Sequence, residues 1–229
     1  MPIVLYELAG ANPAVKFSPY CWRIRMALAH KELAVRSVAW HFVDKEMIAF
    51  SGQSKVPVVV DGERTISDSW AIAEYLEDAY RDRPSLFGGA IGRGEAFFVN
   101  GWVDSTIQPM LSTLIVRDVL DAVAPDDRAY FRSSREARFG RTLEEVQAGR
   151  ETRVLELRRL LSPVRRMLRQ QDYFGGLHPS YADYILFGSL QWARCTSRFQ
   201  LLEADDPVND WFNRVGGLFD GLGASAPRA

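Results

Sequence analysis

The sequence is poor in the residues that build disulfide frameworks and metal sites. Among its 229 residues are only two cysteines and three histidines. Cys21 and Cys195 lie far apart, which argues against a disulfide framework and suits a reducing compartment. His30, His41 and His178 show none of the spacings typical of a zinc site, and we therefore expect no metal.

Long apolar runs and an excess of charge of one sign are also absent. No apolar run approaches the ~20 residues needed to cross a bilayer. The formal net charge of −1 gives no electrostatic reason to expect nucleic acid or an anionic membrane as a partner. The first residues, MPIVLYELAG, lack the basic region and long apolar stretch of a secretory signal. These features predict a cytoplasmic protein that binds neither membrane nor nucleic acid.

The composition that remains is that of a globular protein, with 47% hydrophobic and 25% charged residues. The first 80 or so residues read as strand, helix, strand, an irregular segment over 41–55, then a hairpin and a helix. This order is the outline of an α/β thioredoxin-like domain. The expected strands are 3–8, 35–40, 56–60 and 64–66, and the expected helices are 19–31 and one that Ser67 opens.

The rest of the chain is expected to be all helical. Residues 81–94 are rich in proline, glycine and charge, which is typical of a linker, and no strand alternation follows them. One long helical stripe covers 154–168, and its off-stripe arginines are interpreted as a solvated face. Ser180 and Asp183 form a capping-box pattern before an apolar helix. We place an N-terminal domain over 1–82, a linker over 83–94 and a helical domain over 95–229.

The stretch FSPYCWR (17–23) combines a helix start with a partial redox motif. Ser18 and Pro19 suit the N-cap and first helical positions. In a thioredoxin-type C-x-x-C motif the first cysteine is the nucleophile and occupies the place of Ser18. Cys21 falls on the apolar stripe of the helix, which favours a buried small hydrophobe. Ser18 is therefore either a simple helix cap or a hydroxyl that serves a sulfur from a bound molecule.

Four patterns together resemble the cytosolic glutathione transferases: SPYCWR, SKVP before the hairpin, SDS at the next helix and GGLHPSYAD (175–183). Their order and spacing make the match specific. The resemblance implies a glutathione transferase fold, glutathione as the bound thiol and a homodimer. Four longer segments are similar to the bacterial β-etherases and the fungal etherase-like class: SPYCWRIRMALAHK (18–31), ISDSWAIAEYLEDAYRDRP (66–84), SREARFGRTLEEVQAGRE (134–151) and DWFNRVGGLFDGLG (210–223).

The resemblance implies that Ser18 activates the thiol of glutathione. Lowering a thiol pKa by ~2 units requires about 2.7 kcal/mol of preferential stabilisation of the thiolate. One charge-assisted hydrogen bond of ~1.5–3 kcal/mol and a helix N-terminus of ~0.3–1 kcal/mol are together sufficient. Tyr6, near the end of the first strand, is the reserve catalytic candidate, although an aromatic residue that fills a strand is the commoner explanation.

The resemblance also assigns a glutathione-binding set. It implies a cis Val56-Pro57 bond beside which the Val56 backbone pairs with the cysteinyl group, where a trans proline at a strand start is the alternative. The γ-glutamyl end is matched to a helix start, although ordinary capping explains the same residues. For the glycyl carboxylate, Lys55 is a partner or equally a solvated loop charge. The implied residues are Gln53, Lys55, Val56, Pro57, Asp68 and Ser69.

The electrophile is expected between the two domains, against Phe17, Trp102 and Met110, unless these residues belong to the ordinary core. The implied reaction is attack of glutathione on an aromatic electrophile, with cleavage of a β-aryl ether next to a ketone as the narrower form. General conjugation or isomerisation of xenobiotics is the alternative reaction. A non-catalytic glutathione- or ligand-binding module is the alternative of another class.

Overall fold

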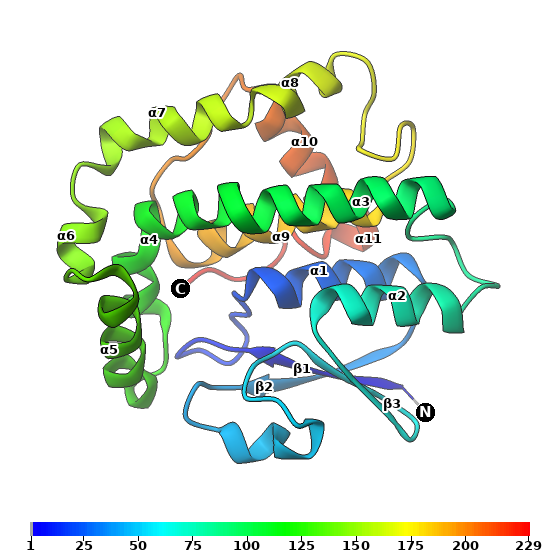
Figure 1. Ribbon diagram of the computed structural model, residues 1–229, viewed down its shortest axis with the longest axis horizontal. Coiled ribbons are helices and arrows are strands. Elements are labelled where there is room, and N and C mark those ends of the chain that lie inside the picture. The colour runs from blue at the N-terminus through cyan, green and yellow to red at the C-terminus, as the bar shows by residue number, and fades with distance from the viewer. Residues whose placement is uncertain (1) are drawn as a thin grey trace.

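A four-stranded sheet is the centre of the N-terminal domain in the computed structural model, which describes residues 2–229. The strand order is β2-β1-β3-β4, with β1 parallel to β2 and antiparallel to β3. Figure 1 shows α1 and α2 on one face of this sheet and the 3-10 helix η1 on the other. The predicted thioredoxin-like domain is confirmed. Its elements are β1 (Ile3–Leu8), α1 (Pro19–His30), β2 (Val35–Trp40), η1 (Lys45–Ser51), β3 (Val58–Asp61), β4 (Arg64–Ser67) and α2 (Ser69–Ala79).

Two boundaries differ from the prediction. The strand expected over 56–60 begins at Val58. Ser67 does not open the helix, because it pairs with Val58 as the last residue of β4. Asp68 is the N-cap instead, and its carboxylate accepts hydrogen bonds from the N–H groups of Trp70 and Ala71 at 2.9 and 3.0 Å.

From Ala90 onward the elements of the described chain are all helices, as predicted. Figure 1 shows α3 and α4 as one long rod beside α1, with α7 and α8 on its far side. Helix α3 begins at Ala90, so residues 90–94 of the predicted linker are helical. The elements are α3 (Ala90–Trp102), the π-turn η2 (Val103–Ile107), α4 (Gln108–Ala122), η3 (Pro125–Asp127), α5 (Arg128–Phe139), α6 (Leu143–Gln147), α7 (Arg150–Leu160), α8 (Ser162–Leu168), α9 (Tyr181–Thr196), α10 (Pro207–Gly216) and α11 (Leu218–Gly221).

The predicted single helix over 154–168 is wrong. It is two helices that meet at Leu161, because Pro163 has no N–H to continue the hydrogen-bond ladder of α7. Two of its arginines are not a solvated face either. Arg165 forms an ion pair with Asp206 at 2.6 Å, and Arg158 donates to a backbone carbonyl of the loop before α10 at 2.8 Å. These arginines hold α7 and α8 against the loop that precedes α10.

The two domains meet along α1 and α9, which approach very closely. A Cβ atom added at Gly188 of α9 would lie 2.4 Å from the carbonyl oxygen of Pro19. On the same helix as Pro19, Arg23 is fully buried, forms an ion pair with Asp104 at 2.6 Å and donates to Asn100 at 2.9 Å. These contacts fix the N-terminal end of α1 against the helical domain.

Substitution Gly188→Ala is expected to lower the free energy of unfolding by about 1–3 kcal/mol. The added methyl meets a backbone oxygen that cannot move without displacing the start of α1. Gly101→Ala in α3 is the matched control, because nothing lies within 4 Å of its added Cβ. That control is expected to be neutral or stabilising by up to about 1 kcal/mol. Urea unfolding measures both, and equal effects contradict the packing argument.

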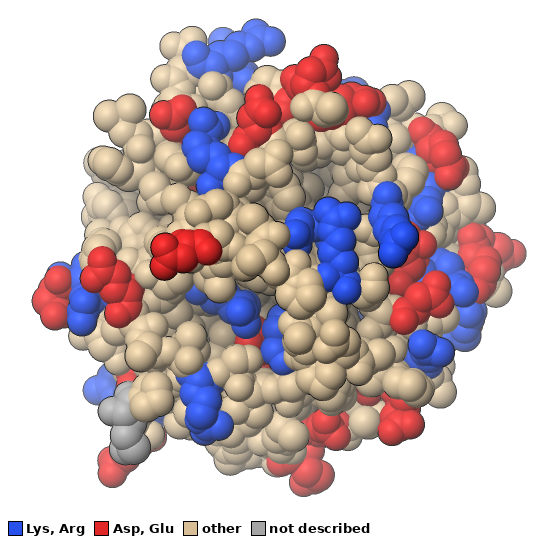
Figure 2. Space-filling view, turned by 180° about the vertical axis from the view of Figure 1, so that it is seen from behind, with Lys and Arg blue, Asp and Glu red and all other residues tan. Residues whose placement is uncertain are grey.

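Figure 2 shows positive and negative side chains interspersed on the face that it views, in keeping with the net charge of −1. No helix of residues 2–229 is long and apolar enough to cross a bilayer.

Candidate active site

A cavity of about 270 Å³ lies where the two domains meet. It is bounded by the first residues of α1, the loop before β3, and helices α4 and α5. The sheet explains why these segments converge. Val58 pairs with both Tyr6 and Ser67, so Val56-Pro57 and Asp68 come to the same edge of the sheet, next to the end of β1.

Ser18 lines this cavity at the start of α1. Its side chain accepts a hydrogen bond from the Cys21 N–H at 3.3 Å, so it is the helix cap that the sequence predicted. No oxygen or nitrogen within residues 2–229 accepts a hydrogen bond from its hydroxyl, and the Cys21 sulfur beside it is only a weak acceptor. Capping and donation are therefore compatible, since the same oxygen that accepts from the helix keeps a proton to donate into the cavity.

Cys21 is confirmed as a buried residue. Its side chain has no exposed surface, and burial raises the pKa of its thiol to about 12. Burial also raises the pKa of Cys195 to about 11. Both sulfurs are thus protonated at neutral pH and make poor nucleophiles. Across the described chain, no three His, Cys, Asp or Glu side chains are grouped so as to hold a metal ion.

The loop before β3 presents free backbone groups to the cavity. The Val56-Pro57 bond is cis, as the resemblance implied. Within residues 2–229, no other group hydrogen-bonds to the N–H or C=O of Val56. Lys55 and Val56 line the cavity, and the exposed Lys55 forms no ion pair in the described chain. This segment therefore offers backbone hydrogen bonds and a positive charge to a ligand.

Gln53, Asp68 and Ser69 lie beside the cavity and do not line it. Asp68 has a φ of 74°, in a region that non-glycine residues seldom adopt and that is often found at functional sites. One of its carboxylate oxygens caps α2, and the other makes no hydrogen bond in the described part of the chain. Ser69 is buried, and its carbonyl accepts a hydrogen bond from the hydroxyl of Tyr181 at 2.7 Å.

Two of the three residues predicted for the electrophile pocket lie elsewhere. Phe17 lines the cavity, whereas Trp102 and Met110 pack, partly buried, against the hydrophobic core. Tyr6 does not line it either. Its ring lies 5.6 Å from that of Phe50 in η1, on the sheet face away from α1. The structure thus brings Ser18 and Phe17 together with Lys55 and Val56, and leaves the reserve tyrosine apart.

Helix α5 supplies most of the aromatic and arginine side chains of the cavity wall that sequence reasoning missed. Phe131, Arg135 and Arg138 follow the i, i+4, i+7 spacing of one helix face. This spacing is the sequence pattern from which they could have been predicted to lie together. The remaining aromatic lining comes from segments far apart in the chain, and no local pattern brings them together. The missed aromatic and arginine lining residues are Tyr20, Trp40, Phe42, Tyr130, Phe131, Arg135, Arg138, Phe139 and Trp192.

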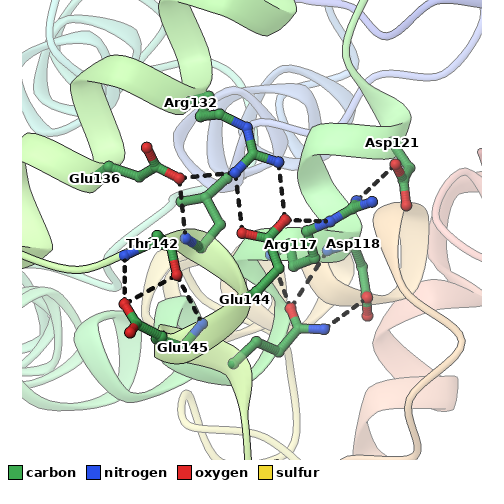
Figure 3. A network of polar contacts seen from close by, with 10 residues as sticks. Arg117, Asp118, Asp121, Arg132, Glu136, Thr142, Glu144 and Glu145 are labelled. Atoms are coloured by element: carbon green, nitrogen blue, oxygen red, sulfur yellow. Dashed lines mark hydrogen bonds and ion pairs between the residues drawn. The ribbon is translucent and has the colours of Figure 1, made fainter.

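A network of ion pairs fixes α5 in this position (Figure 3). Arg132 of α5 binds Glu136 of the same helix at 2.7 Å and Glu144 of α6 at 2.8 Å. Glu144 also binds Arg117 of α4 at 3.1 Å, and Arg117 binds Asp121 at 2.6 Å. The network joins α4, α5 and α6, so the cavity-facing side of α5 is held by contacts on its other side.

Tyr20 and Asp104 line the cavity near Ser18, and Asp104 forms an ion pair with Arg23. Burial, and then the charge of Asp104, raise the pKa of Tyr20, which therefore remains a hydrogen-bond donor at neutral pH. Asp104 sits in the π-turn η2, a type of distortion that is frequent at functional sites. Its charge is offset by Arg23, whose guanidinium also lies 4.6 Å from the centre of the Tyr20 ring.

The fold and the cavity define a two-domain protein of the glutathione transferase type. Residues 13–84 match the family model of the glutathione S-transferase N-terminal domain, and residues 95–213 match that of the C-terminal domain. The chain therefore belongs to the glutathione S-transferase family.

Individual relatives agree with this assignment. Glutathione transferase GSTFuA2 of Phanerochaete chrysosporium is 27% identical, with a TM-score of 0.80 over 100% of this chain and 99% of that one. The glutathione S-transferase CsGST63524 of Ceriporiopsis subvermispora, solved in complex with glutathione, is 23% identical, with a TM-score of 0.82 over 100% of both chains. A zeta-class glutathione S-transferase of Euphorbia esula is 30% identical over 47% of this chain, and the match spans half of that protein's length, 50%.

Proposed function

We propose that the protein is a glutathione transferase in which Ser18 activates the thiol. The observation that carries the proposal is the Ser18 hydroxyl, which lines the cavity at a helix N-terminus and donates to no oxygen or nitrogen of the described chain. The cavity and the segments beside it also suit the rest of the tripeptide. The free backbone of Val56 fits the cysteinyl unit, and unpaired Lys55, with Gln53 nearby, fits the glycyl carboxylate. Asp68 and Ser69, at the start of α2, are assigned to the γ-glutamyl end.

Glutathione supplies the nucleophilic sulfur when it is bound. The Ser18 hydroxyl donates to that sulfur, and the N-terminal end of α1 adds a favourable electrostatic field, so both lower the thiol pKa. A serine is suited to this task because it donates a hydrogen bond without forming a mixed disulfide. The hydroxyl keeps its own proton throughout, and the proton of the thiol passes to solvent.

We further propose an aromatic electrophile, with a β-aryl ether next to a ketone as the narrower substrate. In that reaction a carbon–sulfur bond forms, the carbon–oxygen bond to the aryl group breaks, and the phenolate leaves and takes a proton from water. The aromatic lining of the cavity supports an aryl substrate, because rings pack well against rings. The sequence segments similar to β-etherases support the narrower form.

The assembly and location of the protein are part of the same proposal. We assign it to the cytoplasm as a homodimer. Exposed apolar side chains on α3 support a second copy as the partner, since Ile91, Phe97 and Phe98 are 81%, 60% and 75% exposed.

One assay tests the function directly. The protein and glutathione are incubated in parallel with a β-aryloxy ketone and with a chlorodinitrobenzene, while calorimetry measures glutathione binding. Release of free phenol is the expected result and supports the etherase form. Conjugation of the chloroaromatic alone identifies a general transferase. Glutathione binding without either reaction identifies a binding module, and no binding at millimolar glutathione overturns the proposal.

A further inference from the structure

Two arginines of α5 face the cavity without an acidic partner. Arg135 and Arg138 both line it, and among residues 2–229 no carboxylate forms an ion pair with either guanidinium. Arg132 of the same helix, in contrast, has two acidic partners. Arg138 stands in the last turn, where a positive charge stabilises the helix end. Arg135 stands one turn earlier, so this explanation does not extend to it.

The Arg135 guanidinium is held in place by rings. Its central carbon lies 4.5 Å from the ring centre of Phe131 and 5.0 Å from that of Phe42. One nitrogen donates to the Ser134 hydroxyl at 2.8 Å, and the Tyr130 hydroxyl is a further neutral partner, but no carboxylate of the described chain accepts from the guanidinium. Burial lowers the pKa of Arg135, although an arginine remains charged at neutral pH. A partly desolvated cation without an acidic partner favours the binding of an anion.

Asp104, the acidic residue that lines the cavity, does not serve as the anionic partner of Arg135. Asp104 is bound by Arg23 at 2.6 Å and by Asn100 at 3.1 Å, so its charge is already offset. Lys55 adds a further positive charge, which the proposed function assigns to glutathione. The cavity thus combines an aromatic lining with an excess of positive charge on its α5 side.

From this arrangement we propose that the electrophile is an aromatic anion, such as an aryl carboxylate, whose charged group binds Arg135. A planar carboxylate matches the fork of N–H donors on the guanidinium, and Arg138 adds a second positive charge beside it. The ring of the substrate then packs against the aromatic side chains that line the cavity. The reaction of such a substrate rests on the proposed function. Its binding rests on the residues of the cavity alone.

The test compares chlorodinitrobenzoate with uncharged chlorodinitrobenzene. Each kcat/KM is divided by the uncatalysed rate of the same compound with glutathione, which removes the difference in intrinsic reactivity. In the wild-type protein this ratio is expected to favour the benzoate by about tenfold or more. Arg135→Gln is expected to reduce that preference by about tenfold, and Arg135→Lys to restore part of it. A preference that is absent from the wild type, or unchanged in Arg135→Gln, overturns the inference.

Arg128→Gln is the matched control. Arg128 is an exposed arginine of α5 that does not line the cavity and forms no ion pair within residues 2–229. It carries the same charge on the same helix, so its substitution tests for a general electrostatic effect. We expect the preference for the benzoate to remain unchanged. An equal loss in both variants overturns a specific role for Arg135.

A binding measurement separates this inference from the proposed reaction. Trp40 and Trp192 line the cavity, so quenching of tryptophan fluorescence reports the binding of unreactive dinitrobenzoate and dinitrobenzene. Tighter binding of the benzoate that is lost in Arg135→Gln supports the anion site, even if neither chloroaromatic reacts and the transferase proposal fails. Equal binding of the two compounds overturns the anion site, even if the transferase reaction is confirmed.

Discussion

Substitution Ser18→Ala is expected to lower turnover by about tenfold or more while the affinity for glutathione changes little. The hydroxyl is assigned to the sulfur, whereas the backbone of the tripeptide is assigned to other groups. Loss of one charge-assisted hydrogen bond, worth ~1.5–3 kcal/mol, raises the pKa of the bound thiol by about 1–2 units. Steady-state kinetics measures the turnover, and ultraviolet thiolate absorbance against pH measures the pKa.

Ser54→Ala is the control for this prediction. Ser54 also lines the cavity but lies in the loop before β3, and it does not cap a helix. It is expected to leave the thiol pKa unchanged. Because Ser18 caps α1, its alanine variant must also be shown to be folded under the assay conditions. Wild-type turnover in a folded Ser18→Ala protein would assign the activation of the thiol to another group.

The largest expected effect on stability comes from Asp183→Ala, which should lower the free energy of unfolding by about 3 kcal/mol or more. Asp183 is fully buried at the start of α9. Its carboxylate accepts from the N–H of Ser180 at 2.9 Å, the N–H of Phe174 at 3.0 Å and the indole of Trp211 at 2.9 Å. Alanine leaves these three donors without an acceptor, and each costs about 1–3 kcal/mol when it is buried.

Thermal unfolding checks this prediction, with a fall in melting temperature of about 6–12 °C expected for a chain of this size. Asp183→Asn keeps one acceptor oxygen and should lose less. Asp210→Ala is the control, since Asp210 lies exposed in the first turn of α10 and its side chain makes no hydrogen bond within the described residues. Its effect should stay below about 1 kcal/mol. If both alanine variants melt alike, the capping carboxylate has no special role.

Local patterns predicted the thioredoxin-like half well. The strand at 3–8 and the helix after Ser18 appear where hydrophobic periodicity and the Ser-Pro cap placed them, because both signals act within a few neighbouring residues. The cis bond before Pro57 was implied only by the resemblance, since single residues favour trans. The helix break at Pro163 was missed because an apolar stripe continues on both sides of it.

The part of the cavity wall that the helical domain forms was predicted poorly. Trp102 and Met110 were chosen because they are large and apolar and lie on the helices expected to face the cleft, but the packing of α3 and α4 places them against the core. Which face of a helix meets a cavity depends on its rotation against distant neighbours. For α5 the ion pair between Arg132 and Glu144 ties the helix to α6, and no local pattern reveals this contact.

The sequence by itself determined the two-domain order, the helix that begins at Ser18 and the family to which the chain belongs, since these depend on local periodicity and short motifs. Only the tertiary structure decided which side chains line the cavity with Ser18. It also placed Arg135 among them without an acidic partner. The physical reason is that burial and charge pairing arise between segments far apart in the chain, where the surroundings of a side chain exist only after folding.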